Sequence, residues 1–253
     1  MFLACDIGNS RIKYALFEDD ELIEFNSSKD ENSFLNSIKN KKFESAGISS
    51  VVPYKNPVLS QEIKKISGVQ PYVIDKSSPF SIKLNYETLD TLGIDRICSG
   101  EGAYEILQTK FPKFINKKNN YVLIIDFGTA TTINILKMPY EFIGGMILPG
   151  IEMMFSSLQK NTDQLPSASE RDYKNFIGTS TNSSIASGII NSHAGLIDML
   201  RNYLIKKKAE EIKIFATGGN SEKIIPYLDF DFDYEKALVV IGINAVSRKL
   251  KSL

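Results

Sequence analysis

The sequence predicts an α/β protein made of two similarly folded halves. Stretches with strand periodicity alternate with amphipathic helical stretches along the 253 residues. Two apolar strands end in the same kind of turn, Asp6–Ser10 (DIGNS) and Asp126–Thr129 (DFGT), and the two aspartates lie 120 residues apart. Each turn is followed by an alternating strand and then by a third strand, so a structural duplication is the simplest interpretation. We expect two repeats that face each other across a cleft.

The elements of the first half follow from its apolar periodicity. Met1–Cys5 is apolar, and Arg11–Phe17 alternates apolar and polar residues as a hairpin partner would. The expected strands are Met1–Cys5, Arg11–Phe17, Glu21–Phe25, Glu44–Val52 and Tyr72–Asp75, and the expected helices are Glu31–Lys39, Leu59–Ile66 and Asp95–Phe111.

A polar stretch separates the two halves. Pro112 to Asn120 is rich in Lys and Asn and begins with a proline, which is typical of a boundary. We therefore predict an N-terminal domain over residues 1–118 and a C-terminal domain over residues 119–253. In the second domain the expected strands are Tyr121–Ile125, Thr132–Leu136, Glu141–Ile147 and Ile212–Ala216, and the expected helices are Asn182–Lys207 and Glu235–Leu250.

Composition excludes several classes of partner. Lys plus Arg and Asp plus Glu both number 30, so no overall field favours nucleic acid or an anionic membrane. Cys5 and Cys98 are too few for a disulfide framework and lack metal-ligand spacing, which indicates reduced thiols. The apolar start is too short for a signal peptide, and the run Ala237–Val246 is too short to span a membrane. We expect a cytoplasmic protein.

The two Asp-x-Gly turns carry the chemistry. Glycine allows a ligand close to the backbone, and successive backbone N–H groups bind phosphate. The hydroxyls of Ser10 and Thr129 can add a phosphate or cation contact, and an aspartate at a strand end can hold Mg²⁺. One such turn is common in plain hairpins. Two at corresponding positions of a duplication favour a phosphate-binding cleft.

Four other features of the sequence bear on its function. Thr217–Asn220 (TGGN) follows a short strand, and alone it fits an ordinary strand-to-helix turn as well as a nucleotide contact. No Walker or dinucleotide-binding glycine motif is present, which disfavours those classes. Asp95 lies in Gly93–Arg96 (GIDR) at a helix start, where the helix dipole already favours an aspartate. The sole histidine, His193, lacks a nucleophile motif and is expected to be structural or on the surface.

These motifs together resemble the type III pantothenate kinase family over nearly the whole chain. The six motifs, in the family's order and spacing, are Asp6–Ser10, Gly93–Arg96, Asp126–Thr132 (DFGTATT), Gly144–Gly150 (GGMILPG), Ile177–Thr181 (IGTST) and Thr217–Gly219. The resemblance implies a duplicated actin-like (ribonuclease H-like) fold, with mixed sheets flanked by helices and an ATP cleft between the domains. It also implies ATP-dependent phosphorylation of pantothenate to 4′-phosphopantothenate, the first step of coenzyme A synthesis. The implied cofactors are ATP, Mg²⁺ and a monovalent cation, K⁺ or NH₄⁺, and the implied assembly is a homodimer.

The resemblance also assigns roles to residues. Asp95 would be the general base, and Asp126 and Asp6 would help hold the monovalent cation and Mg²⁺, respectively. The residues implied to contact ATP are Asp6, Ile7, Gly8, Asn9, Ser10, Arg11, Ile12, Lys13 and Thr129. Those implied to line the pantothenate pocket are Tyr86, Gly93, Ile94, Asp95, Arg96 and Thr181, with Thr181 acting from the partner chain of the dimer.

The chain departs from the family pattern at two positions. Ser10 stands where the family usually has Thr, which keeps the hydroxyl. Asn134 stands where the family often has Asp, which changes the local charge. Three alternatives stay open: a kinase for another small hydroxylated substrate, a regulatory or accessory relative, and a polymerising actin-like protein.

Overall fold

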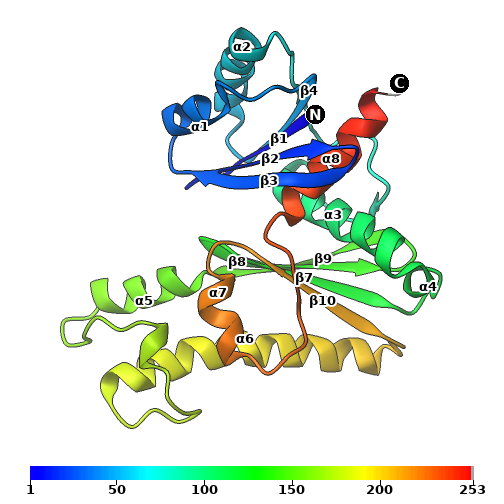
Figure 1. Cartoon of the computed structure of the whole chain (residues 1–253). Coiled ribbons are helices and arrows are strands. Elements are labelled where there is room, and N and C mark those ends of the chain that lie inside the picture. Colours follow the sequence, from blue (N-terminus) through cyan, green and yellow to red (C-terminus); the bar gives the residue numbers. More distant parts are fainter. Residues whose placement is uncertain (252–253) are drawn as a thin grey trace. The chain divides into compact units, whose positions relative to one another are not determined.

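The computed structural model describes residues 1–251. These residues form two compact units (Figure 1). The first contains residues 1–116 and 139–143 and the chain from Ala237 onward, and the second contains residues 117–138 and 144–236. One of these divisions, between Asn116 and Lys117, lies close to the boundary expected at residue 118, while the C-terminal segment clusters with the first unit.

The sheet of the first unit has the strand order β3-β2-β1-β4-β5. Its strands are β1 (Phe2–Ile7), β2 (Ile12–Glu18), β3 (Glu21–Ser28), β4 (Ser45–Ser50) and β5 (Tyr72–Val73). The central strand β1 is antiparallel to β2 and parallel to β4. The C-terminal end of β1, which contains Asp6 and Ile7, therefore lies beside the C-terminal end of β4.

The second sheet repeats this arrangement. Its strands are β7 (Tyr121–Phe127), β8 (Ala130–Lys137), β9 (Glu141–Pro149), β10 (Ile212–Thr217) and β11 (Asp233–Tyr234), in the order β9-β8-β7-β10-β11. The central strand β7 is antiparallel to β8 and parallel to β10. The order and these directions match those of the first sheet, which confirms the predicted duplication. The two-residue strand β6 (Lys83–Leu84) pairs with the beginning of β9.

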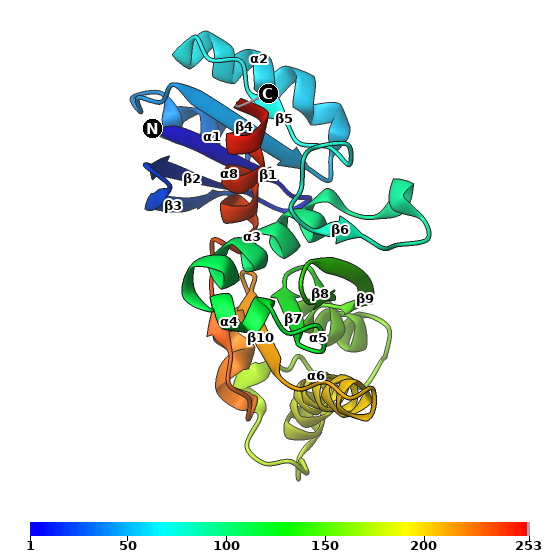
Figure 2. The same cartoon turned by 90° about the vertical axis from the view of Figure 1, so that its right-hand side faces the viewer.

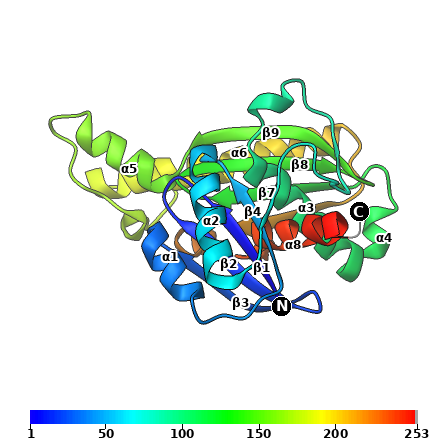
Figure 3. The same cartoon turned by 90° about the horizontal axis from the view of Figure 1, so that it is seen from above.

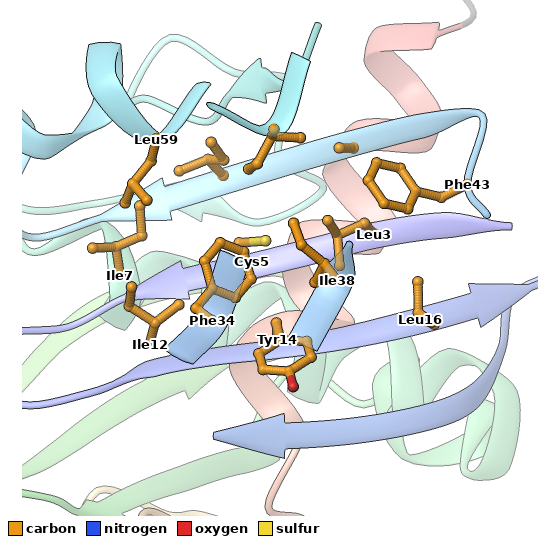
Figure 4. Packing of buried hydrophobic residues seen from close by; sticks show 13 residues of the cluster. Leu3, Cys5, Ile7, Ile12, Tyr14, Leu16, Phe34, Ile38, Phe43 and Leu59 are labelled. Atoms are coloured by element: carbon orange, nitrogen blue, oxygen red, sulfur yellow. The ribbon is translucent and has the colours of Figure 1, made fainter. Parts of the chain in front are cut away.

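Helices cover both faces of the first sheet. One face packs against α1 (Glu31–Ile38) and α2 (Asn56–Ser67), seen lying over the sheet in Figure 3. Alternate residues of β1 and β2 point into this core because side chains of a strand alternate between its faces. Figure 4 shows the resulting cluster, in which Phe34 and Ile38 of α1 meet Leu3 and Cys5 of β1.

The other face is covered by α3 (Ile94–Lys110) and α8 (Leu238–Lys251) (Figure 2). Gly47 of β4 lies against Ile243 and Ser247 of α8. The two helices touch through glycine: a Cβ on Gly102 would lie 2.0 Å from the carbonyl oxygen of Leu238, and one on Gly242 would lie 1.9 Å from that of Cys98. Backbone-to-backbone contact at this crossing therefore requires both glycines.

The second unit is built around the long helix α6 (Thr181–Lys206), which runs along its sheet (Figure 1). The helix starts at a capping box in which Ser180 and Ser183 satisfy each other's backbone N–H groups. Its apolar face buries Ile185, Ile189, Ile197, Leu200 and Leu204. The remaining helices are α4 (Pro112–Ile115), α5 (Ile151–Lys160) and α7 (Ser221–Ile224), with single 3₁₀ turns at Pro53–Lys55, Leu89–Thr91, Glu170–Asp172 and Ile225–Tyr227.

The strands before the two turns are longer than the sequence pattern indicates. β1 and β7 each run two residues past the expected end, so Asp6 and Asp126 belong to strands rather than to loops. The sequence analysis gave no element at α5 or β6. Among residues 1–251, no helix has both the length and the apolar composition needed to cross a bilayer.

Candidate active site

The first turn is a tight hairpin between β1 and β2. The Gly8 amide donates to the Arg11 carbonyl at 3.0 Å, and Asp6 pairs directly with Lys13 across the ladder. Asp6 is 6% exposed, whereas Asn9, Ser10 and Arg11 are exposed. The side chains of Ile7 and Ile12 belong to the buried cluster, so only their backbone can face a ligand. The turn thus presents a short polar tip in front of a buried carboxylate.

The second turn encloses the carboxylate of Asp126 between glycines. A Cβ on Gly218 would lie 2.3 Å from Asp126 Oδ1, and one on Gly128 would lie 3.2 Å from it. Gly218 has φ +101°, a conformation that glycine adopts readily. Asp126 Oδ1 and the Oγ1 of Thr217, its neighbour in β10, are buried without a hydrogen-bond partner in the protein. Buried oxygens of this kind need a hydrogen-bond donor or a cation, so the residues fit a cation that binds oxygen ligands.

Two further sequence motifs pack onto this second turn. The Asn220 amide donates to the Phe127 carbonyl at 2.9 Å, and its side-chain Nδ2 donates to the Gly128 carbonyl at 3.3 Å. From the other motif, the Gly150 amide donates to the Thr129 carbonyl at 3.1 Å. A Cβ on Gly150 would lie 2.3 Å from that oxygen, so the position requires glycine. The Thr129 side chain itself is exposed.

Asp95 occupies the first turn of α3. Its Oδ1 accepts a hydrogen bond from the Arg96 amide at 2.8 Å, and the residue is half-buried. A Cβ on Gly93 would lie 2.5 Å from the same oxygen, so glycine at position 93 leaves room for the carboxylate. The positive end of the helix dipole favours the ionised form there.

Arg96 is buried against two aromatic rings that also touch each other. Its guanidinium carbon lies 5.9 Å from the ring centre of Tyr86 and 5.8 Å from that of Phe142, and Arg96 is 7% exposed. The two rings contact each other edge-on, with their centres 6.2 Å apart. The structure thus brings Tyr86 into contact with Arg96. It adds Phe142, which the sequence analysis did not single out because its position depends on the pairing of β6 with β9.

Cys98 is a buried thiol on α3, the helix that carries Asp95. Burial raises the pKa of Cys98, and the negative charges of Asp6, Asp95 and Glu101 raise it further. The raised pKa keeps Cys98 protonated and therefore a poor nucleophile.

Thr181 lies in the second unit, at the start of α6. Its side chain is exposed and lines a cavity of about 700 Å³. The other residues of this cavity are Leu165, Gly178, Thr179, Ser180, Ser184 and Ile185. Gly178 lies against the backbone of Ser183 and Ser184, which explains the glycine of the Ile177–Thr181 motif.

His193 and Asn134 are buried behind the second turn. His193 is 2% exposed, and burial lowers its pKa, which favours the neutral ring. Its Nδ1 lies 2.9 Å from the Ile189 carbonyl and therefore donates, which leaves Nε2 to accept from Thr131 Oγ1 at 3.2 Å. This supports a structural role. Asn134 is fully buried on β8, on the same face of the β7–β8 ladder as Asp126.

Comparison with known proteins identifies relatives of one family that align with nearly the whole chain. A family model described as type III pantothenate kinase matches residues 2–202. A type III pantothenate kinase of Finegoldia magna is 28% identical over 264 aligned residues, covering 98% of this chain and 97% of the relative. One of Desulfosudis oleivorans is 30% identical over 234 residues, covering 87% of this chain and 88% of the relative.

A solved structure supports the fold alone. A Baf family protein of Campylobacter jejuni, described as a conserved transcriptional activator, superposes with a TM-score of 0.62 at 20% identity, over 99% of this chain and 100% of that one. Together with the repeated strand order, this likeness confirms the expected fold of two similar mixed sheets flanked by helices.

Proposed function

Because this chain belongs to the type III pantothenate kinase family, we propose that it transfers the γ-phosphate of ATP to the hydroxyl of pantothenate with Asp95 as the general base. The proposed role of Asp95 as the general base rests on the position of its carboxylate. The carboxylate is half-buried, is held by the Arg96 amide at 2.8 Å, and stands next to Arg96, whose guanidinium can bind an anionic substrate group. A carboxylate placed in this way can orient a hydroxyl and accept its proton as the new O–P bond forms.

The two turns are proposed to hold ATP. The exposed tip of the first turn and the exposed Thr129 side chain offer backbone and hydroxyl donors to phosphate. Asp6 is assigned to Mg²⁺ and Asp126 to a monovalent cation, K⁺ or NH₄⁺, and the uncompensated Asp126 Oδ1 supports the latter assignment. When bound, such cations neutralise the charge that builds on the transferring phosphoryl group. Residues 1–251 contain no group of three or more His, Cys, Asp or Glu side chains gathered as a metal site, so phosphate and water oxygens would complete the coordination.

Arg96 and Tyr86 are proposed to recognise pantothenate. Pantothenate carries a carboxylate, and an arginine can bind a carboxylate through two parallel N–H donors. Packing against Tyr86 and Phe142 restricts the guanidinium before substrate arrives, so little side-chain entropy is lost on binding. Gly93 and Ile94 complete the segment around the general base.

We place the enzyme in the cytoplasm.

The first experiment is a product assay. We expect purified protein with ATP, Mg²⁺, K⁺ and pantothenate to give 4′-phosphopantothenate by mass spectrometry, and activity to fall when Na⁺ or Li⁺ replaces K⁺. Unchanged activity in Na⁺ or Li⁺ would contradict the monovalent cation. No product from a folded protein that phosphorylates another hydroxylated compound in a substrate panel would instead indicate a different acceptor, and no product with any compound would indicate an accessory relative.

The proposed assembly is a homodimer formed through α6. The exposed face of this helix carries Ser184, Gly188, Ser192 and Gly195 at intervals of three and four residues. No atom lies within 4 Å of a Cβ built on Gly188 or on Gly195. An exposed mid-helix glycine costs about 1 kcal/mol relative to alanine, and close approach of a second helix would offset that cost. Thr181 begins the same face, which supports its assigned role across the interface.

We predict that Gly188→Gln converts the dimer to a monomer. Glutamine favours the helix, so each chain should stay folded, but its side chain would keep a second helix at a distance. Light scattering coupled to size-exclusion chromatography should give half the mass of the unmodified protein. Asn36→Gln, on the exposed face of α1, introduces the same residue elsewhere and should leave the mass unchanged. A Gly188→Gln protein that remains dimeric would exclude this face as the interface.

A further inference from the structure

A buried carboxylate on α3 holds the segment that carries Tyr86. Glu101 is 1% exposed. Its two oxygens accept the Ser81 amide at 3.0 and 2.9 Å, and Oε2 also accepts the Ile82 amide at 3.3 Å. Lys249 of α8 donates to Oε1 at 2.6 Å. Burying a charge is costly unless it is paired and hydrogen-bonded, and here the donors come from two segments far apart in the sequence.

The segment that Glu101 binds leads directly to Tyr86. After Ile82 the chain forms β6, whose Lys83 amide donates to the Tyr140 carbonyl at 2.7 Å, and the Asn85 amide donates to the Phe142 carbonyl at 2.9 Å. Tyr86 then meets Phe142 and the guanidinium of Arg96. One helix therefore contacts both ends of residues 81–86, through Glu101 at the start and Arg96 at the end. The five-residue separation of these two anchors corresponds to about 7.5 Å along the helix axis.

We propose that Glu101, neutralised by Lys249, is a positioning residue for substrate binding. It fixes residues 81–86 so that Tyr86 stays packed on Arg96 and the guanidinium is already oriented when the substrate carboxylate arrives. The inference rests on the proposed roles of Tyr86 and Arg96 and assigns Glu101 no contact with the reacting atoms. It also gives α8 a part in the substrate pocket, through the Lys249 ammonium.

The test compares Glu101→Gln with Glu105→Gln. The amide at position 101 has one acceptor oxygen in place of two and no charge. If that oxygen takes the place of Oε2 and keeps the Ser81 and Ile82 amides, the NH₂ group faces the Lys249 ammonium; if it takes the place of Oε1, the Ile82 amide loses its acceptor. Either orientation weakens the attachment of residues 81–86 to α3. Glu105 is the matched control, because it lies one turn further along α3 and pairs with Arg248 of the same helix α8. The contacts found for Glu105 involve no residue of 81–86. Both variants thus remove an ion pair between α3 and α8, but only one touches the Tyr86 segment.

Two measurements decide the proposal. In Glu101→Gln we expect the KM for pantothenate to rise at least tenfold, with kcat and the KM for ATP within about twofold, and Glu105→Gln should leave all three within twofold. For a readout independent of turnover, Tyr86→Trp places the sole tryptophan in a chain that has none. In the Tyr86→Trp protein, adding Glu101→Gln should shift the emission to longer wavelength and increase acrylamide quenching, while adding Glu105→Gln should not.

Each outcome bears on a different statement. Unchanged tryptophan emission in the Glu101→Gln background would overturn the positioning role, whatever the kinetics. If the emission changes but the KM for pantothenate does not, Glu101 does not position a substrate-binding residue, and the proposal is overturned. That result would also contradict the proposed roles of Tyr86 and Arg96 in binding pantothenate. An equal loss of affinity for both substrates would indicate a merely structural role. Should Glu101→Gln fold poorly, the Glu101→Gln/Lys249→Met double variant leaves no unpaired buried charge and decides the question by the same measurements.

Discussion

Replacing Asp95 with asparagine is expected to lower turnover by about 10²- to 10⁴-fold, the range for loss of a general base. Asparagine retains an oxygen for the Arg96 amide, so the start of α3 should be preserved, but it cannot accept the proton of the attacking hydroxyl. The KM values for ATP and pantothenate should change much less than kcat. The measurement is steady-state kinetics, with circular dichroism and thermal unfolding to verify the fold.

Asp90→Asn provides the control for Asp95→Asn. Asp90 lies five residues earlier, in an exposed 3₁₀ turn outside the proposed site. Asp90→Asn therefore removes the same charge without changing a residue of that site. Its kinetics should match those of the unmodified enzyme. A folded Asp95→Asn protein with turnover close to that of Asp90→Asn would remove Asp95 from the mechanism and leave phosphate activation to the turns and cations alone.

The second large effect is expected from Gly218→Ala. Alanine at φ +101° is strained, and its Cβ would lie 2.3 Å from Asp126 Oδ1 and 2.6 Å from the backbone of Phe127. Displacing that backbone costs about 2 kcal/mol or more, which lowers Tm by roughly 4–8 °C in a chain of this size. It also moves Asp126 and the second turn, so ATP should bind at least tenfold more weakly. Thermal unfolding and isothermal titration with ATP measure the two effects.

The neighbouring glycine supplies a matched control for Gly218→Ala. Gly219 has no atom within 4 Å of a built Cβ and no positive φ, so Gly219→Ala should leave Tm and ATP affinity nearly unchanged. A Gly218→Ala protein with a lowered Tm but normal ATP affinity would separate the stability of the second turn from nucleotide binding. Equal behaviour of the two variants would contradict the packing of Gly218 on Asp126.

The sequence predicts elements well where the signal is local. The alternation of β2 and the apolar runs of β1 and β7 follow directly from residue type, and the offset of the two aspartates reveals the duplication. The sequence does not predict β6, because two residues hold no periodicity and the strand exists only through its pairing with β9. The helix α5 was not among the expected elements, although Ile151, Met154, Phe155 and Leu158 recur at helical spacing and could have revealed it.

The residues of the candidate site likewise fall into those that the sequence marks locally and those that only the fold brings together. Asp95 and the two turns are marked by short motifs, so their residue types can be recognised one by one. Glu101 lies outside every motif, and its importance appears only when Ser81 and Lys249 are brought to it by the fold. Phe142 likewise gains a role from strand register. For Gly218 and Gly150, sequence marks the glycine, but only the structure shows that each makes room for another part of the second turn.

The crossing of α3 and α8 has a consequence for biosynthesis. The helix α8 is translated after all five strands of the first sheet and after α3, yet it covers one face of that sheet. Until α8 is made, the face of the β1–β4 sheet and the surface of α3 at Gly102 therefore remain uncovered. By then residues 144–236 already have their own sheet partners. A premature stop codon just before α8 would consequently spare most of the later-made unit and disable the earlier-made one, which carries Asp6 and Asp95.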